Sequence, residues 1–268
     1  MVGMSFLLRP VQLLWKHRYI IRQTVLNDIR ARYAGSILGL FWMFLYPLLF
    51  LGIYAATYLY IFHISVSNFS PAEYVTLIFA GLIPFIGFSD ALATGVSSVS
   101  ANANLIKNTL FPIELIPVKA VLASQATQFV GTMILLVAIV AVGKLTLFAL
   151  LLPVIWFFQL AFCMGLAWLL SSLNVLIRDT QNIVSILILM LMLISPIAYT
   201  VDMIPPRLAP FIKLNPLYYF IVAYQNILVL GKLPPANILI AVVLLGILSF
   251  GAGYWLFVRL KSVFFDYA

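Results

Sequence analysis

Aromatic residues recur every four positions in the first long apolar stretch of the chain. The series is Trp42, Tyr46, Phe50, Tyr54, Tyr58 and Phe62. On a helix, successive rings of this series stand about 40° apart, so they form a slowly winding ribbon. Pyranose rings stack on aromatic faces, and a row of rings and phenol hydroxyls that faces a cavity would let a sugar polymer slide along it. The same ribbon also fits rings that face lipid or neighbouring helices.

Asp90 is the one acidic residue inside a long apolar stretch, in the segment GFSDALATG. A carboxylate at membrane depth is costly, which makes it a candidate for function. Small and hydroxyl-bearing residues lie near it at Gly87, Ser89, Gly95 and Ser97. They favour close helix packing or a polar lining. Three interpretations of Asp90 stay open: a structural hydrogen bond, contact with a transported molecule, and proton coupling.

The sequence does not contain the residue groups of an enzyme. Its seven acidic residues are widely spaced, so they predict neither paired carboxylates nor a nucleophile beside a base. The phosphate-binding motif GxxxxGK[ST] is missing, because Leu145 follows Gly143-Lys144 and Ala138 stands at the place of the first glycine. We therefore expect no ATP hydrolysis and no bound cofactor in this chain.

Cysteine and histidine residues form no metal-binding pattern. Cys163 stands alone in an apolar stretch, and His17 and His63 lie far apart without close acidic or histidine neighbours. A zinc or catalytic site needs several such side chains together. We expect no metal site and assign these three residues no chemistry.

Composition indicates that the bilayer is the solvent of this chain. Of its 268 residues, 65% are hydrophobic and 8% are charged, a balance that no water-soluble domain carries. Backbone amides inside a bilayer must pair internally, so the long, non-alternating apolar runs predict helices. The formal charge of +8 is scattered near the ends of these runs, so we do not expect nucleic acid as a partner.

The hydropathy pattern predicts an all-α integral membrane protein with six transmembrane helices in a single domain over 1–268. An amphipathic helix over 9–33 comes first and lies along the membrane surface, with Ile21, Val25, Ile29 and Tyr33 on one face. The spans, each near the ~20 residues that a crossing needs, are expected within 37–258. Their ranges are 37–62, 74–98, 118–142, 147–171, 183–199 and 237–258.

Residues 201–235 fit neither a loop nor a span. Apolar stretches at 217–223 and 227–230 lie among six prolines. Short helices that re-enter the outer leaflet satisfy both facts, provided that protein or a water-filled cavity covers the broken backbone. We therefore expect periplasmic re-entrant helices before the last span.

Basic residues predict the orientation of the chain in the membrane. Eleven lysines and arginines fall on one side of the six spans and four on the other. The side richer in lysine and arginine is cytoplasmic as a rule. Both termini are therefore expected in the cytoplasm, as an even number of spans requires.

Six segments form an ordered set that covers almost the whole chain. They are DIRARYAGSILGLFWMFLYPLL at 28–49, GLIPFIGFSD at 81–90, NANLIKNTLFPIELIPV at 102–118, IRDTQNI at 177–183, SPIAYT at 195–200 and LNPLYYFIVAYQNIL at 214–228. Together they resemble the permease subunits of bacterial polysaccharide ATP-binding-cassette exporters of the type-two export family. Within that family the resemblance is nearest to exporters of lipid-linked O antigen.

This resemblance implies a homodimer of six-span subunits with two copies of a separate cytoplasmic ATPase, which binds the ATP and magnesium. The assembly would move an undecaprenyl-pyrophosphate-linked polysaccharide through the bacterial inner membrane, among its lipids, from cytoplasm to periplasm. The aromatic ribbon would line the path. Capsule or teichoic-acid exporters, and drug or lipid exporters of the same superfamily, are the alternatives.

The resemblance also implies roles for particular residues. The ATPase would be contacted by the amphipathic helix and by the loop between spans two and three, through Arg22, Asp28, Arg30, Asn104, Lys107, Phe111 and Glu114. Arg30 and Arg32 would meet the lipid pyrophosphate as it enters, because guanidinium binds phosphate oxygens in pairs. A hairpin of short periplasmic helices would form a gate that includes Pro205, Asn215, Tyr218 and Tyr219.

Overall fold

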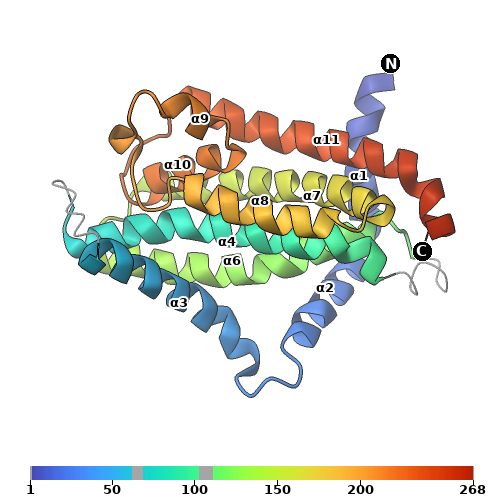
Figure 1. The fold of residues 1–268 in the computed structure, drawn as a ribbon, viewed down its shortest axis with the longest axis horizontal. Helices are drawn as coiled ribbons and strands as arrows, with labels where there is room; N and C mark the ends of the chain where they lie inside the picture. Colours follow the sequence, from blue (N-terminus) through green and yellow to red (C-terminus); the bar gives the residue numbers. More distant parts are fainter. Residues whose placement is uncertain (1, 62–68, 103–110, 268) are drawn as a thin grey trace.

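The computed structural model describes residues 2–61, 69–102 and 111–267, and within them all regular structure is helical (Figure 1). Short 3-10 or π turns precede or follow several helices, at Gly39–Phe41, Thr57–Ile61, Leu147–Leu151 and Val201–Met203. The α-helices are α1 (Val2–Lys16), α2 (Arg18–Arg32), α3 (Trp42–Ala56), α4 (Pro71–Ala101), α6 (Leu115–Val142), α7 (Leu152–Leu176), α8 (Thr180–Ile194), α9 (Ala209–Lys213), α10 (Pro216–Leu228) and α11 (Ala236–Tyr267).

Five helical segments of the described chain are long and apolar enough to cross a membrane. They are Gly39–Ile61, Pro71–Ala101, Leu115–Val142, Leu147–Leu176 and Ala236–Lys261. These segments match five of the six predicted spans. The last four of them lie roughly parallel, whereas α3 in the first segment is inclined to them, and both chain termini lie toward the same end of the bundle (Figure 1).

The predicted fifth span is a shorter helix than expected. Its helix, α8, has 15 residues and ends at Ile194, although the prediction ran to residue 199. Pro196 explains the early end, because a proline disfavours helical geometry in the residue before it, and Ser195 is extended at φ −72° and ψ 141°. Helix α8 still runs along the bundle, from the end that holds the termini toward the end that holds α9 and α10 (Figure 1).

The N-terminal amphipathic segment is two helices rather than the single predicted one. Helices α1 and α2 are separated at His17, and they pack on different parts of the bundle, α1 against α11 and α2 against α6. The predicted apolar face of α2 is confirmed: Ile21 is buried, and Val25 and Ile29 are half-buried. The break follows from these two separate packing partners.

Helix α4 forms the centre of the bundle, packing against α3, α6, α7, α8 and α10. It begins with a capping box, in which the Glu73 amide donates to the Ser70 hydroxyl and the Ser70 amide donates to the Glu73 carboxylate at 2.7 Å. The ammonium of Lys144, just after α6, lies 3.0 Å from the same carboxylate. These contacts fasten the neighbouring ends of α4 and α6.

A buried polar network joins four helices inside the bundle. The Gln128 amide on α6 donates to Gln159 Oε1 on α7 at 3.1 Å and to the Tyr224 hydroxyl on α10 at 3.0 Å. Gln159 in turn donates to the Pro84 carbonyl on α4 at 2.8 Å. Because unpaired polar groups are costly away from water, this network specifies how the four helices meet.

The segment before the last helix contains short helices, as predicted. Helix α10 is largely buried and packs against α4, α7 and α11. Asn215 caps it by accepting from the Leu217 amide at 2.9 Å, and its own amide donates to the Ser195 hydroxyl at 2.8 Å. This segment lies at the end of the bundle opposite the chain termini (Figure 1).

Candidate functional site

Helices α2 and α3 leave the bundle together and form a V beside α4 and α6 (Figure 1). The chain reverses between them at two glycines with positive φ, Gly35 at 77° and Gly39 at 50°. Glycine adopts this left-handed geometry without a steric penalty. Within α3, all of which the structure describes, Pro47 is the one fully buried residue. The other side chains of α3 are exposed or half-buried, so part of this helix is open to ligands or to another protein surface.

A cleft of about 420 Å³ lies inside the V, and a smaller one of about 370 Å³ on the other side of α2 is lined by residues of α2 alone. The lining residues of the larger cleft come from α2, the following turn, α3, α4 and α6. They are Arg32, Tyr33, Ser36, Trp42, Tyr46, Asp90 and Thr127. One cation, one carboxylate, hydroxyl groups and aromatic rings thus share a single cleft, which we call the Arg32 cleft.

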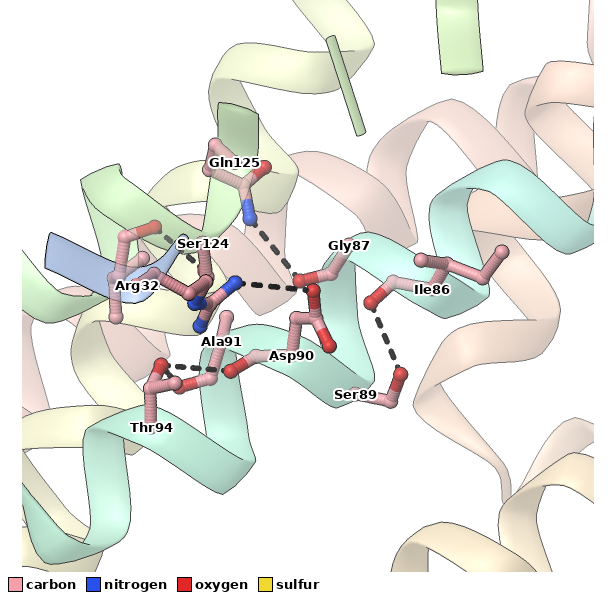
Figure 2. A network of polar contacts seen from close by, with 10 residues as sticks. Arg32, Ile86, Gly87, Ser89, Asp90, Ala91, Thr94, Ser124 and Gln125 are labelled. Atoms are coloured by element: carbon pink, nitrogen blue, oxygen red, sulfur yellow. Dashed lines mark hydrogen bonds and ion pairs between the residues drawn. The ribbon is translucent and has the colours of Figure 1, made fainter. Parts of the chain in front are cut away.

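Arg32 and Asp90 form an ion pair in this cleft, with Nη1 and Oδ2 at 3.5 Å (Figure 2). Both side chains are partly accessible, Arg32 at 33% and Asp90 at 26%. The hydroxyls next to Asp90 on α4 are bonded to backbone carbonyls, Ser89 to Ile86 at 2.9 Å and Thr94 to Asp90 at 2.7 Å. The Asp90 carboxylate therefore faces Arg32 rather than the hydroxyl groups of its own helix.

The predicted aromatic ribbon is a continuous row of neighbouring rings that starts at the Arg32 cleft. Ring centroids are 5.4 Å apart for Tyr46 and Phe50, 6.2 Å for Phe50 and Tyr54, and 6.0 Å for Tyr54 and Tyr58. The last two pairs are nearly parallel, at 20° and 16°. We call these four residues the aromatic ladder. Trp42 stands at its foot and donates to the Ser36 hydroxyl at 3.1 Å, whereas Phe62 lies outside the described residues.

Three of the predicted ATPase contacts lie on α2, and they divide between two of its faces. Arg22 and Arg30 are exposed, and both line the other α2 cleft, of about 370 Å³. Asp28 faces the bundle, where its carboxylate lies 3.1 Å from the buried Lys119 ammonium of α6. Lys119 also donates to Asn102 Oδ1 at the end of α4, at 3.4 Å. Movement of α2 would thus act on α4 and α6 through one lysine.

The remaining predicted ATPase contacts lie at the loop between α4 and α6. Asn104 and Lys107 fall outside the described residues, and Phe111 is half-buried. Glu114 is buried, and its carboxylate accepts from Lys261 of α11 at 2.6 Å. Its contact with an ATPase stays a prediction, because in this chain the carboxylate already has an internal partner.

The two arginines predicted to meet the pyrophosphate do not share a site. Arg30 lies on the exposed side of α2 and Arg32 in the Arg32 cleft. Residues two apart on a helix point about 200° from one another, so both cannot line one cleft. Arg32 alone lies next to the aromatic ladder, which makes it the better candidate for an anion that precedes a sugar chain.

The chain matches the ABC-2 type transporter family over residues 20–229. It belongs to that family. It is 29% identical over 261 residues to the O-antigen export system permease protein RfbA of Myxococcus xanthus, covering 96% of this chain and 98% of the relative. RfbA of Klebsiella pneumoniae is 30% identical over 77% of this chain and 79% of its own, and the polysialic acid transport protein KpsM of Escherichia coli is 27% identical over 73% and 76%.

Family membership and the five apolar helices make this chain a multi-pass membrane permease subunit. The match begins at residue 20, in α2, and ends at residue 229, just after α10. The Arg32 cleft, the aromatic ladder and the α9–α10 segment all fall within it. The site described above therefore belongs to the part of the chain that the family shares.

The residues predicted to form a gate of this ABC-2 permease lie near one another at the α9–α10 segment. Pro205 is exposed, and Asn215 caps α10. The rings of Tyr218 and Tyr219 meet edge to face at 5.1 Å, and the Tyr219 hydroxyl donates to the Lys213 carbonyl at 3.0 Å. Tyr218 lines a cleft of about 340 Å³ between this segment and the start of α11. Its function as a gate stays a prediction.

Sequence reasoning missed two polar features of this permease. Lys119 was counted only as a charge at a membrane boundary, although it joins three helices. Gln125 and Gln128 stand three residues apart on α6, one helical turn, and both are buried. Amides at helical spacing inside an apolar run were the signal that could have predicted the buried network.

Proposed function

We propose that this chain is the membrane-spanning subunit of an ATP-driven exporter of O-antigen-type polysaccharide. Two copies and two separate ATPase subunits would move an undecaprenyl-pyrophosphate-linked chain from the cytoplasm to the periplasm of a bacterium. The observation that carries the proposal is the aromatic ladder, which begins at a cleft with an accessible arginine. The likeness to O-antigen permeases along nearly the full length of both chains supports the substrate class.

The ladder suits a polymer better than a single small molecule. Its four rings follow the helix axis at similar spacings and form a continuous aromatic row, in which Tyr46 is exposed and the other three rings are half-buried against the bundle. Stacking is tolerant of sequence, and phenol hydroxyls exchange hydrogen bonds with water as easily as with sugar. A glycan could thus advance from ring to ring without a deep energy well.

The homodimer is supported by the exposure of α3. Apolar side chains of α3 outside the ladder, among them Leu48, Leu49 and Ile53, are exposed, and a second copy of the chain would supply a surface that covers them. In this arrangement α8 and the extended residues after it form the sixth crossing. Both termini then lie on the cytoplasmic side, and α9 and α10 re-enter from the periplasmic side.

The ATPase would act from the cytoplasmic end of the bundle. The exposed arginines of α2 face outward there, while Asp28 connects the same helix to α6 through Lys119. Motion of a docked ATPase would reach α4 and α6 through this contact. The chain itself carries no phosphate-binding loop, so ATP and magnesium would be bound by the partner.

A capsule polysaccharide is the second candidate substrate, because KpsM, a polysialic acid transport protein, is also similar to this chain. Both substrate classes would use the aromatic ladder.

Export from membrane vesicles tests the proposed function. Inverted vesicles would contain this chain alone, or this chain with the ATPase encoded beside it, together with undecaprenyl-pyrophosphate-linked glycan. We expect transfer of the glycan into the lumen only with the partner and ATP. Transfer driven by a pH gradient without the ATPase would contradict the proposal.

A further inference from the structure

Asp90 lies within α4 rather than at its end, and only 26% of its side chain is accessible. Helix α4 ends at Ala101, and at 1.5 Å per residue Asp90 stands about 16 Å from that end. A largely buried carboxylate is costly unless a partner or water compensates its charge. Arg32, the last residue of α2, supplies that partner from outside the bundle.

The pair is loose, and Arg32 keeps capacity for another ligand. Its closest contact with Asp90 is 3.5 Å, at the long end of hydrogen-bond distances, and a third of its side chain is accessible. A guanidinium has several N–H donors in a planar fork and binds two oxygens of one phosphate side by side. In the described chain, Asp90 is the one acidic residue within ion-pair distance of Arg32.

We propose that the Arg32 cleft is an oxyanion site in which Asp90 is the internal competitor of the substrate. The empty site holds a neutral Arg32–Asp90 pair, and the pyrophosphate of the lipid-linked glycan displaces the carboxylate to bind Arg32. Trp42 and Tyr46 on the wall of the same cleft then receive the first sugar, at the foot of the aromatic ladder. This inference rests on the proposed function and adds the means of substrate selection to it.

Competition of this kind discriminates between phosphates by charge. A pyrophosphate that links a lipid to a sugar carries two negative charges, whereas the phosphodiester of an ordinary phospholipid carries one. Coulombic attraction to Arg32 grows with the charge of the ligand, and the ligand must outcompete a carboxylate that is already present. A phospholipid headgroup, with its single negative charge, would therefore not displace Asp90 from Arg32, whereas the pyrophosphate would.

Binding of farnesyl pyrophosphate tests the proposal without requiring transport. The permease–ATPase complex in nanodiscs would be titrated with the radiolabelled probe, as wild type and as Asp90→Asn, Arg32→Gln and the double variant. We expect Asp90→Asn to bind about three- to tenfold more tightly, because the competitor has lost its charge. Arg32→Gln and the double variant should both lose binding.

Two further proteins serve as controls. Asp179→Asn removes an exposed acidic charge far along the chain from the cleft, and it should bind the probe as wild type does. Arg32→Lys keeps the positive charge without the planar fork, so it should bind weakly while remaining folded. Each protein must elute as a single species in gel filtration before it is titrated.

The source of the anion is distinguished by the choice of probe and lipid. Farnesyl pyrophosphate should bind more tightly than farnesyl monophosphate, and nanodiscs with or without phosphatidylglycerol should give the same affinity for it. Tighter binding of inorganic pyrophosphate than of the farnesyl compound would mean a soluble ligand, and full competition by phosphatidylglycerol would mean a headgroup site. Either result would overturn the proposal.

The decisive variant separates this inference from the proposed function. If Asp90→Asn binds the probe no better than wild type, Asp90 is a structural partner of Arg32 and the inference is wrong, even where vesicles export glycan. If Asp90→Asn binds more tightly and yet wild-type vesicles export no glycan, the oxyanion site stands and the proposed substrate is wrong.

Discussion

At the residue scale, the charges that this chain places away from water have partners from distant parts of the sequence. Arg32 meets Asp90, and Lys119, which is 9% accessible at its side chain, meets Asp28. An ionised group in a medium of low dielectric is costly without a counter-charge. The two pairs differ in accessibility. A ligand can reach the Arg32–Asp90 pair, whereas the Lys119–Asp28 pair has a buried ammonium and holds helices together.

Replacing the aromatic ladder should impair export without unfolding the protein. A variant with Tyr46, Tyr54 and Tyr58 all changed to Ala loses three of the four stacking surfaces. We expect ATP-dependent glycan export to fall by at least about tenfold, since one base stacked on an aromatic ring contributes about 1–3 kcal/mol in comparable sites. The matched control is Phe148→Ala with Phe157→Ala, exposed rings outside both the ladder and the proposed interface on α3. Equal export by both variants would remove the ladder from the path.

The Gln128 amide is expected to be the most sensitive polar group of the buried network. Gln128→Leu leaves Gln159 Oε1 and the Tyr224 hydroxyl without their donor. We expect the free energy of unfolding to fall by about 1 to 2 kcal/mol, measured by reversible unfolding in mixed micelles. Met133→Leu, at an exposed position of the same helix, is the control and should leave stability unchanged. Similar stability of the two variants would mean that water replaces the lost donor.

At the scale of elements, α7 and α11 approach one another at glycines. A side-chain carbon built on Gly253 of α11 would collide with the Gly165 backbone of α7. Small residues at such a contact let helix backbones pack closely in a membrane. The position of α11 relative to α7 depends on this approach.

Gly253→Val should therefore separate α11 from α7. Overpacking of this kind costs about 1–3 kcal/mol, which would appear as a lower melting temperature in the detergent-purified protein. Ala252→Val adds similar bulk at the exposed neighbouring position and should melt like the wild type. A Gly253→Val protein with unchanged melting temperature would show that the helices can shift to make room.

The contact between α2 and α6 should couple ATP hydrolysis to transport. Asp28→Asn removes the counter-charge of the buried Lys119, so motion of α2 would reach α6 less completely. We expect about two- to thirtyfold less glycan exported per ATP hydrolysed, the range of typical coupling energies. The exchanged pair, Asp28→Lys with Lys119→Asp, should recover part of this ratio, and Asp179→Asn should not change it. A normal ratio in Asp28→Asn would place the coupling elsewhere.

At the scale of the whole molecule, the exposed side of α3 should be an interface between two copies of the chain. Cys163 is the one cysteine of the sequence and is buried. Cross-linking by a thiol reagent therefore reports on an introduced cysteine, with little contribution from Cys163. We expect Ile53→Cys on α3 to give covalent dimers with a short bifunctional thiol reagent in native membranes. Val154→Cys on α7, similarly exposed, should remain monomeric. Dimers only from the α7 position would move the interface to the other side of the bundle.

The sequence by itself determined the features that depend on neighbouring residues. Hydropathy over about twenty residues located five of the spans, and a four-residue period identified the row of the ladder and the apolar face of α2. These features are local, because helix geometry relates positions a few residues apart in the same way in every helix. The six quoted segments also led to the ABC-2 family, which the match over residues 20–229 confirms.

Only the tertiary structure decided which distant groups meet. The pairing of Arg32 with Asp90, the separation of Arg32 from Arg30, and the division of the N-terminal segment at His17 all depend on how α2 packs beside α4 and α6. Hydropathy does not specify the counter-charge of a buried group, because any basic residue in reach would satisfy it. The choice follows from helix packing, which is set by glycines, buried amides and caps that come together from different helices.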